Sequence, residues 1–284
     1  MTDLNFTLTT KEIQSRIDDA VNKHDISDNS LLKRMFSLID LTSLNTQDND
    51  ETIKGMVKKV NDFPNHYPDM PDVAAICIYP PFVKLVKENV SRDNIHVAAV
   101  SAGFPSSQTY MSVKLAECEI ANNKGADELD IVLSLGKYFE GDLTHCSTEI
   151  SLIKQAIKPS HLKVILESGL MNKLTDVYQA SMLALKSGAD FIKTSTGKDK
   201  KSADPVSVYV MCQAIKNHYE ETGFKAGIKP AGGISTPNDA LAYYAVVDDV
   251  LGEEWLNNKL FRIGASRLAN NLLTAIEGKE VAYF

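Results

Sequence analysis

Short apolar runs alternate with longer amphipathic segments along most of this chain. The short runs have the length and composition of strands that are buried on both faces. The longer segments repeat apolar residues at the i, i+3, i+4 and i+7 positions of a helix, as Ile53, Met56, Val57 and Val60 do. Eight strands are predicted in this way, at residues 36–44, 73–79, 96–102, 127–133, 161–167, 190–194, 225–229 and 260–264.

Helix boundaries between these strands are marked by capping residues. An acid or threonine followed by proline indicates two helix starts, and a glycine indicates two helix ends. These positions are Asp204-Pro205, Thr236-Pro237, Gly188 and Gly223. Eight strand-then-helix units predict an α/β fold, a (β/α)8 TIM barrel, with an additional N-terminal helix at about residues 10–23. We expect a single barrel domain over residues 1–284, with a helical extension at 1–30 and a tail at 278–284; a doubly wound open sheet is the alternative.

Charged residues occupy one face of several predicted strands. Glu128 and Asp130 alternate with Leu129 and Ile131, which places the acids on one face and the apolar side chains on the other. If the apolar faces meet the helices, the charges converge on the barrel axis. The residues concerned are Asp40, Glu128, Asp130, Lys163, Glu167, Lys193 and Lys229. Glu128 and Lys163 come early in their strands, so a purely structural ion pair is the alternative interpretation for them.

Two of these charges are lysines near the ends of consecutive strands. A buried lysine is rare, and a desolvated amine loses proton affinity and becomes a nucleophile. Because adjacent strands lie about 4.8 Å apart, Lys193 and Lys229 are expected to lower each other's pKa. This pattern indicates imine chemistry on a phosphorylated carbonyl compound, whereas salt-bridged structural lysines are the alternative.

Glycine-containing turns follow the sixth, seventh and eighth predicted strands. In TIM barrels such loops commonly bind phosphate, because glycine allows backbone N–H groups to approach the oxygens. The candidate phosphate-binding residues are Gly197, Lys198, Gly232, Gly233, Gly264, Ala265 and Ser266. Ordinary turn geometry is the alternative for any one of them, but three turns at consecutive strand ends favour a phosphate site.

Composition restricts the remaining classes of function. The 284 residues carry a formal net charge of −7, which argues against a general nucleic-acid surface. The sequence contains no run of 18 apolar residues, so no membrane-spanning helix is expected. The start of the chain, residues 1–5, lacks the features of a secretory signal, so a cytoplasmic protein is expected. Cysteines and histidines are too scattered for a metal site; the four cysteines are Cys77, Cys118, Cys146 and Cys212.

Four segments together resemble the deoxyribose-phosphate aldolase family, over about residues 38–273. They read AAICIYP at 74–80, DELD at 127–130, DFIKTSTG at 190–197 and KPAGG at 229–233. The resemblance implies a class I, metal-independent aldehyde-lyase that needs no cofactor. Such an enzyme reversibly cleaves 2-deoxy-D-ribose 5-phosphate to D-glyceraldehyde 3-phosphate and acetaldehyde. The implied partners are small phosphosugars and aldehydes, with neither nucleic acid nor membrane, and a homodimer is usual in the family.

The family pattern also implies roles for individual residues. Lys193 would form the Schiff base, Lys229 would perturb its pKa, and Asp130 would work with a water in proton transfer. The substrate-binding residues implied are Asp40, Thr42, Cys77 and Thr196. No residue is assigned to a metal.

One position departs from the family pattern. Arg267 stands where a small hydroxyl residue often follows Ser266, and it would either reinforce phosphate binding or point to solvent. In the tail, Tyr283 would either reach the site as a proton carrier or simply pack. Two other interpretations stay open, a different phosphosugar enzyme on the same barrel (a further lyase, an isomerase or a pyridoxal-phosphate enzyme using Lys193) and a silent phosphosugar-binding barrel.

Overall fold

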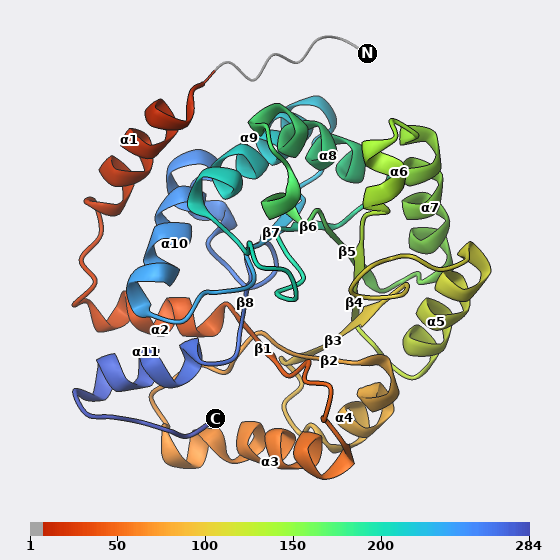
Figure 1. Cartoon of the computed structure of the whole chain (residues 1–284). Helices are drawn as coiled ribbons and strands as arrows, with labels where there is room; N and C mark the ends of the chain where they lie inside the picture. Colours follow the sequence, from red (N-terminus) through yellow and green to blue (C-terminus); the bar gives the residue numbers. More distant parts are fainter. Residues whose placement is uncertain (1–7) are drawn as a thin grey trace.

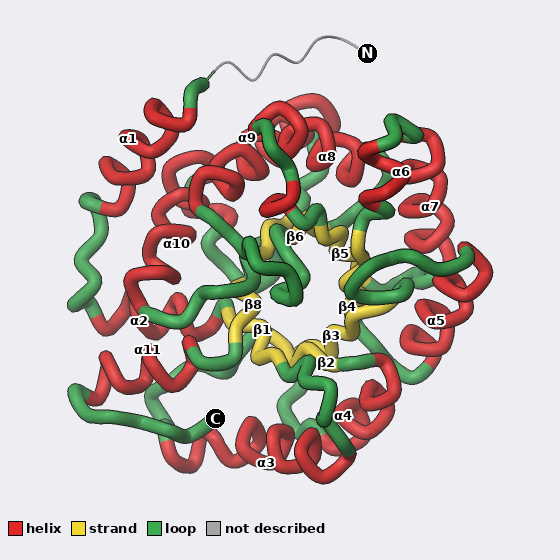
Figure 2. Tube along the Cα trace, viewed as in Figure 1, coloured by secondary structure: helices red, strands yellow, loops and turns green. Residues whose placement is uncertain are grey.

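Eight parallel strands form a ring at the centre of the molecule, and helices surround it (Figure 2). The structure is a computed structural model that describes residues 8–284. Residues 1–5, in which no secretory signal is expected, lie outside the described part of the chain. The strand order β7-β6-β5-β4-β3-β2-β1-β8 and the alternating helices confirm the predicted (β/α)8 TIM barrel (Figure 1).

The ring closes between β7 and β8 through isolated parallel bridges, which join Ile228 to Phe261 and Ala231 to Gly264. The Gly264 amide donates a hydrogen bond of 2.9 Å to the Pro230 carbonyl. An open sheet, the alternative topology, would leave these backbone groups without a partner strand.

The strands and the helices have the following bounds. The strands are β1 (Ile39–Thr42), β2 (Ala75–Ile78), β3 (His96–Ser101), β4 (Glu128–Val132), β5 (His161–Ile165), β6 (Phe191–Lys193), β7 (Gly227–Lys229) and β8 (Ile263–Ala265). The helices are α1 (Thr10–Val21), α2 (Asn29–Ser37), α3 (Asp50–His66), α4 (Val83–Asn89), α5 (Met111–Asn123), α6 (Leu135–Phe139), α7 (Leu143–Ala156), α8 (Leu174–Lys186), α9 (Pro205–Thr222), α10 (Pro237–Leu251) and α11 (Leu268–Glu277), with 3-10 turns at Pro80–Phe82, Ser168–Leu170 and Glu253–Trp255.

Every predicted strand is present, although each is shorter than the apolar run that predicted it. The first run began too early, because Phe36 belongs to α2, which Asp28 caps by accepting a hydrogen bond from the Ser30 amide. At the other end of a strand, Glu167 was placed inside β5 but lies beyond it, with a left-handed φ of 49°. Apolar composition alone therefore misjudged where strands meet helices and turns.

The predicted helix boundaries are confirmed at both proline-containing caps. Asp204 accepts a hydrogen bond from the Ser207 amide at the start of α9, and Thr236 forms a capping box with Asp239 at the start of α10. Gly223 ends α9 with a left-handed φ of 73°. These caps set where each helix begins and ends, and so fix the length of the loops over the barrel.

The extensive apolar core lies between the outer face of the sheet and the helix ring. The N-terminal helix α1 adds a further layer, since Ile13 and Ile17 are buried and α1 packs against α9 and α10 outside the ring (Figure 1). Within residues 8–284, we find no helix whose length and apolar character would let it cross a membrane. With apolar side chains on the outer face of the strands, the polar ones are left for the interior.

Candidate active site

Charged side chains from five strands and from the residue before β8 meet inside the barrel, as the strand alternation predicted. All of them are buried, with 3% or less of their surface exposed. We call this set the axial network; its members are Asp40, Glu128, Asp130, Lys163, Lys193, Lys229 and Arg262. Glu167, which was expected among them, lies outside it because β5 ends before this residue.

Asp130 is the acid that joins the two strand lysines. Its Oδ2 atom accepts hydrogen bonds of 2.8 Å from Lys193 Nζ and of 2.8 Å from Lys229 Nζ. The register explains this meeting, because β6 and β7 pair with Lys193 directly opposite Lys229. Both amines therefore lie on the same side of the sheet, inside the barrel, as the imine hypothesis requires.

Further ion pairs connect Asp130 to the rest of the axial network. Asp130 Oδ1 accepts a hydrogen bond of 2.9 Å from Lys163, which also pairs with Glu128. Arg262 donates to Glu128 at 2.7 Å and to Asp40 at 2.7 Å. The predicted ion pair of Glu128 with Lys163 is thus confirmed, and it is part of the same network as the strand lysines.

The count of charges in the axial network indicates that one of its basic groups is uncharged. The carboxylates are those of Asp40, Glu128 and Asp130, and the basic groups are those of Lys163, Lys193, Lys229 and Arg262. With four basic groups against three acids, the network is balanced when one amine carries no charge. An unbalanced buried charge is costly, so the interior favours the loss of one proton.

Lys193 is the group that gives up this proton most easily. Burial lowers its pKa, and the Lys229 ammonium lowers it further, against the opposing effect of Asp130. For Lys229, burial also acts to lower the pKa, but Asp130 and Asp40 outweigh it and raise the pKa well above its ordinary value. The expected mutual lowering of the two pKa values is therefore wrong. Of these two pKa values only that of Lys193 is lowered, because Lys229 has a second carboxylate partner, Asp40, 2.5 Å from its Nζ.

Asp130 itself stays ionised. Burial alone would raise its pKa, but the lysines around it lower it well below the ordinary value, and Lys163 and Lys229 remain as ammonium groups when Lys193 is uncharged. A carboxylate held in this way is a weak base. It can orient the lysine amines, and a water between them and a substrate, without keeping a proton for itself.

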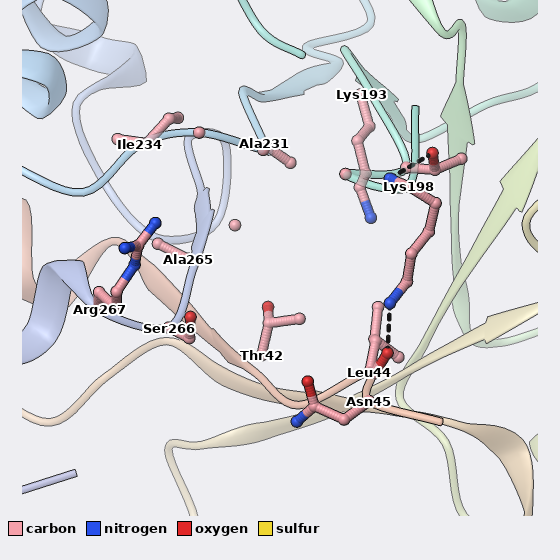
Figure 3. Close-up of a pocket in the computed structure, with 15 residues that line it drawn as sticks. Thr42, Leu44, Asn45, Lys193, Lys198, Ala231, Ile234, Ala265, Ser266 and Arg267 are labelled. Atoms are coloured by element: carbon pink, nitrogen blue, oxygen red, sulfur yellow. Dashed lines mark hydrogen bonds between the residues drawn. The ribbon is translucent and has the colours of Figure 1, made fainter. Parts of the chain in front are cut away.

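A cavity of about 220 Å³ opens above the network, at the carboxyl ends of the strands. Ten of the predicted site residues line it, namely Thr42, Lys193, Thr196, Gly197, Lys198, Gly232, Gly233, Gly264, Ala265 and Ser266. Figure 3 shows Lys193 reaching into it from one side, with Ser266 and Arg267 on the opposite side. Of the described residues that line this cavity, none is acidic and three are basic, so it suits an anionic ligand.

Glycine turns after β6, β7 and β8 line much of the cavity. Gly232 and Gly233 have φ values of 85° and 78°, which residues with a side chain rarely adopt. Helix α11 begins just after Arg267, so its free amide groups lie beside this end. Arg267 is exposed and lines the cavity, and its side chain has no hydrogen bond or ion pair with another described residue. The sequence left open whether it faces solvent or a ligand, and the structure places it at the cavity.

Loop residues near Lys193 make further contacts. Lys198 donates a hydrogen bond of 2.5 Å to the Leu44 carbonyl, so its side chain joins the loop after β6 to the loop after β1 (Figure 3). Thr196 donates to Glu167 at 2.5 Å through its hydroxyl. Burial raises the pKa of Glu167, although Thr196 opposes this. Glu167 was not assigned a site role from the sequence; its left-handed backbone next to a strand end is visible only in three dimensions.

The opposite interior wall, on β2 and β3, is apolar. Ala75, Cys77, Ala98 and Val100 form a buried cluster with Leu44. Burial raises the pKa of the Cys77 thiol, which lies 3.9 Å from Lys229 Nζ, so this cysteine is present as the neutral thiol. The side of Lys193 that faces this wall therefore has a low dielectric constant, which disfavours its charged form.

The C-terminal tyrosine lies against α3. The Tyr283 hydroxyl donates a hydrogen bond of 2.7 Å to the Lys59 carbonyl, and its ring packs against Phe63 and Tyr67. This arrangement is the packing alternative that the sequence left open. Arg262, by contrast, received no role from the sequence, although it stands in the last predicted strand run and completes the network.

Comparisons with known proteins agree with this geometry. A family model described as DeoC/LacD family aldolase matches residues 34–253. The protein named deoxyribose-phosphate aldolase from Homo sapiens is 39% identical over 259 residues, covering 85% of this chain and 79% of that one. Its counterpart from Mus musculus is 37% identical with the same coverage. A solved structure, the tetrameric deoxyribose phosphate aldolase from Aeropyrum pernix, superposes with a TM-score of 0.68 at 23% identity over 94% of this chain and 98% of that chain, which concerns the fold alone.

Proposed function

The chain belongs to the DeoC/LacD aldolase family, and we propose that it cleaves 2-deoxy-D-ribose 5-phosphate through a Schiff base on Lys193. The products of this reversible carbon–carbon lyase reaction are D-glyceraldehyde 3-phosphate and acetaldehyde. The observation that carries the proposal is the amine of Lys193, which is buried, has a lowered pKa and opens into a cavity with basic residues at both ends.

The reaction begins when the uncharged amine attacks C1 of the open-chain sugar. Loss of water then gives an iminium, which accepts the electron pair released when the C2–C3 bond breaks. The proton of the C3 hydroxyl must leave at this step, and C2 of the resulting enamine must later gain one. Hydrolysis of the imine releases acetaldehyde and restores Lys193.

Asp130 and Lys229 support these proton transfers. Asp130 lies 2.8 Å from the Lys193 amine, close enough to orient a water that takes the C3 hydroxyl proton and returns a proton to C2. Lys229 remains an ammonium beside it, which stabilises negative charge on Asp130 and disfavours a second positive charge on Lys193. Asp40 holds Lys229 in place at 2.5 Å.

The cavity orients the substrate along its length. The two-carbon end of the sugar lies at Lys193 beside the apolar wall that includes Cys77, with Thr42 and Thr196 near its hydroxyl groups. The phosphate lies at the glycine turns that contain Gly232 and Gly233. Binding of a remote phosphate supplies orientation at the reacting carbon, so loss of the phosphate should lower the rate as well as the affinity.

Borohydride trapping tests the proposal directly. The protein is incubated with 2-deoxyribose 5-phosphate and sodium borohydride, digested, and examined by mass spectrometry. A reduced adduct on Lys193 is expected, and release of glyceraldehyde 3-phosphate is measured in parallel. An adduct confined to a different lysine, or cleavage without any adduct, would contradict the assignment.

Arg267→Ser is expected to weaken recognition of the phosphate, because an unpaired guanidinium at the cavity suits a phosphate dianion. The value of kcat/KM for 2-deoxyribose 5-phosphate should fall about tenfold. The value for 2-deoxyribose without phosphate should not change. Steady-state kinetics with both sugars make the comparison.

The matched control is Lys279→Ser, which removes one positive charge from an exposed position near the C-terminus. It should leave both kinetic values unchanged. If Arg267→Ser lowered kcat/KM equally for the two sugars, Arg267 would not be a phosphate ligand.

A further inference from the structure

The axial network extends beyond the active site to the opposite mouth of the barrel. Lys193 contacts Asp130 at 2.8 Å, and Asp130 contacts Lys163 at 2.9 Å. Lys163 pairs with Glu128, whose Oε1 lies 2.8 Å from His96 Nδ1. These five side chains form one unbroken series of hydrogen-bonded charged and polar groups.

The two ends of this series lie at opposite faces of the barrel. Lys193 is the last residue of β6, at the carboxyl ends of the strands where the cavity opens. His96 is the first residue of β3, and Glu128 is the first residue of β4. The barrel interior thus carries a path of charges from the candidate nucleophile to the face without the cavity.

His96 is the exposed member of the series. Its side chain is 41% exposed, whereas the side chain of Glu128 is fully buried. On its inner side, Glu128 also accepts hydrogen bonds from Arg262 at 2.7 and 3.2 Å. In the register of β4 and β5, His161 lies beside Glu128 at the same mouth of the barrel. His96 therefore meets solvent on one side and the buried network on the other.

The interior members leave little room for a change of charge. Burial opposes every ionised group, yet the opposite charges around them lower the pKa of Glu128 and Asp130 well below the ordinary value and raise that of Lys163. These three groups therefore keep their charges. Only the two ends of the series remain, and positive charges at both ends repel each other, because a buried path screens charge far less than water does.

We propose that His96 is a positioning residue of the aldolase. A positive charge on its side chain, at the barrel face opposite the cavity, favours the uncharged amine of Lys193 at the cavity face. The inference rests on the proposed function, since the uncharged amine matters through imine formation. A positive charge at residue 96 would lie against Glu128 and act on Lys193 through Lys163 and Asp130. Removing that charge makes protonation of Lys193 easier, and fixing it makes protonation harder.

Two substitutions that change the charge in opposite ways test this proposal. His96→Gln keeps a hydrogen-bonding group but can carry no charge, whereas His96→Arg carries a permanent charge. Imine formation needs the free amine, so the acid limb of the kcat/KM–pH profile should move to higher pH in His96→Gln and to lower pH in His96→Arg. We expect the two limbs to differ by about half a pH unit, with the unsubstituted protein between them.

The matched controls are His24→Gln and His24→Arg, since His24 faces Asp248 at 3.3 Å outside the barrel. Neither should move the acid limb. Thermal melting of all four variants reports loosening of the fold, which would move both His96 variants in the same direction. Shifts in the same direction, or two His96 profiles that coincide with the unsubstituted one, would overturn the inference.

The proposed function is checked separately in the same series. Borohydride trapping of the unsubstituted protein reports the Lys193 adduct without reference to His96. An adduct on Lys193 combined with unshifted limbs would refute only the role of His96, whereas absence of the adduct would refute the proposed function itself.

Discussion

Lys193→Met is expected to abolish aldol cleavage while leaving the fold as stable as before. Methionine has nearly the same length as lysine but no amine, so no imine forms. Loss of a covalent nucleophile should lower kcat/KM at least ~10⁴-fold. The loss is measured by release of glyceraldehyde 3-phosphate from 2-deoxyribose 5-phosphate, and the borohydride adduct should disappear with it.

The stability of this variant follows from the charge count. Lys193 is the one basic group in excess within the axial network, and Asp130 keeps Lys163 and Lys229 when it is gone. Replacing a buried polar group by an apolar one of similar volume is then close to neutral. The free energy of unfolding should change by no more than about 1 kcal/mol in urea denaturation. Activity above one hundredth of the original, or a large loss of stability, would contradict these assignments.

Lys229→Met is expected to have the opposite balance of effects. Lys229 lies between Asp40 and Asp130, and its removal leaves both carboxylates buried with one fewer cation. Breaking a buried ion pair in this way should lower the free energy of unfolding by about 3–5 kcal/mol. The two variants form a matched pair, because both replace a buried lysine by methionine on adjacent strands.

The pH dependence of Lys229→Met should change as well. The Lys229 ammonium helps to keep the pKa of Lys193 low, next to burial, which is the larger cause. Without that ammonium the pKa of Lys193 rises, so a higher pH is needed to obtain the free amine. The acid limb of the kcat/KM–pH profile therefore moves to higher pH. A shift of about one pH unit or more is expected, as for other close charges in buried sites. An unchanged acid limb of the pH profile, or a stability equal to that of Lys193→Met, would contradict this interpretation.

Much of the fold was predictable from local pattern. Strands such as β4 show their two faces directly, because Glu128 and Asp130 alternate with apolar neighbours, and a period of two is a local property of an extended chain. Helix starts were equally local, since Asp204 with Pro205 caps α9 whatever lies around it. The meeting of the charges inside the barrel followed from these faces and from the need to bury the apolar ones.

The exact partners within the site could not be predicted in this way. Arg262 lies far along the chain from Asp40 and Glu128, and the pairing of β8 with β1 brings it beside both carboxylates. His96 was counted only among the histidines that are too scattered for a metal site, since nothing near it in sequence suggests the contact with Glu128. Glu167 was assigned to a strand because its run is apolar, whereas a left-handed turn directs it to Thr196.

The sequence by itself determined the eight strand-and-helix units, the inward face of the charged residues and the two lysines on consecutive strands. Tertiary structure decided which of those lysines has the lowered pKa. Both are buried, but Lys229 has two carboxylates against it and Lys193 shares one. That difference depends on how Asp40 and Asp130 from distant strands are aligned across the barrel, and electrostatic energies follow distances in space rather than positions along the chain.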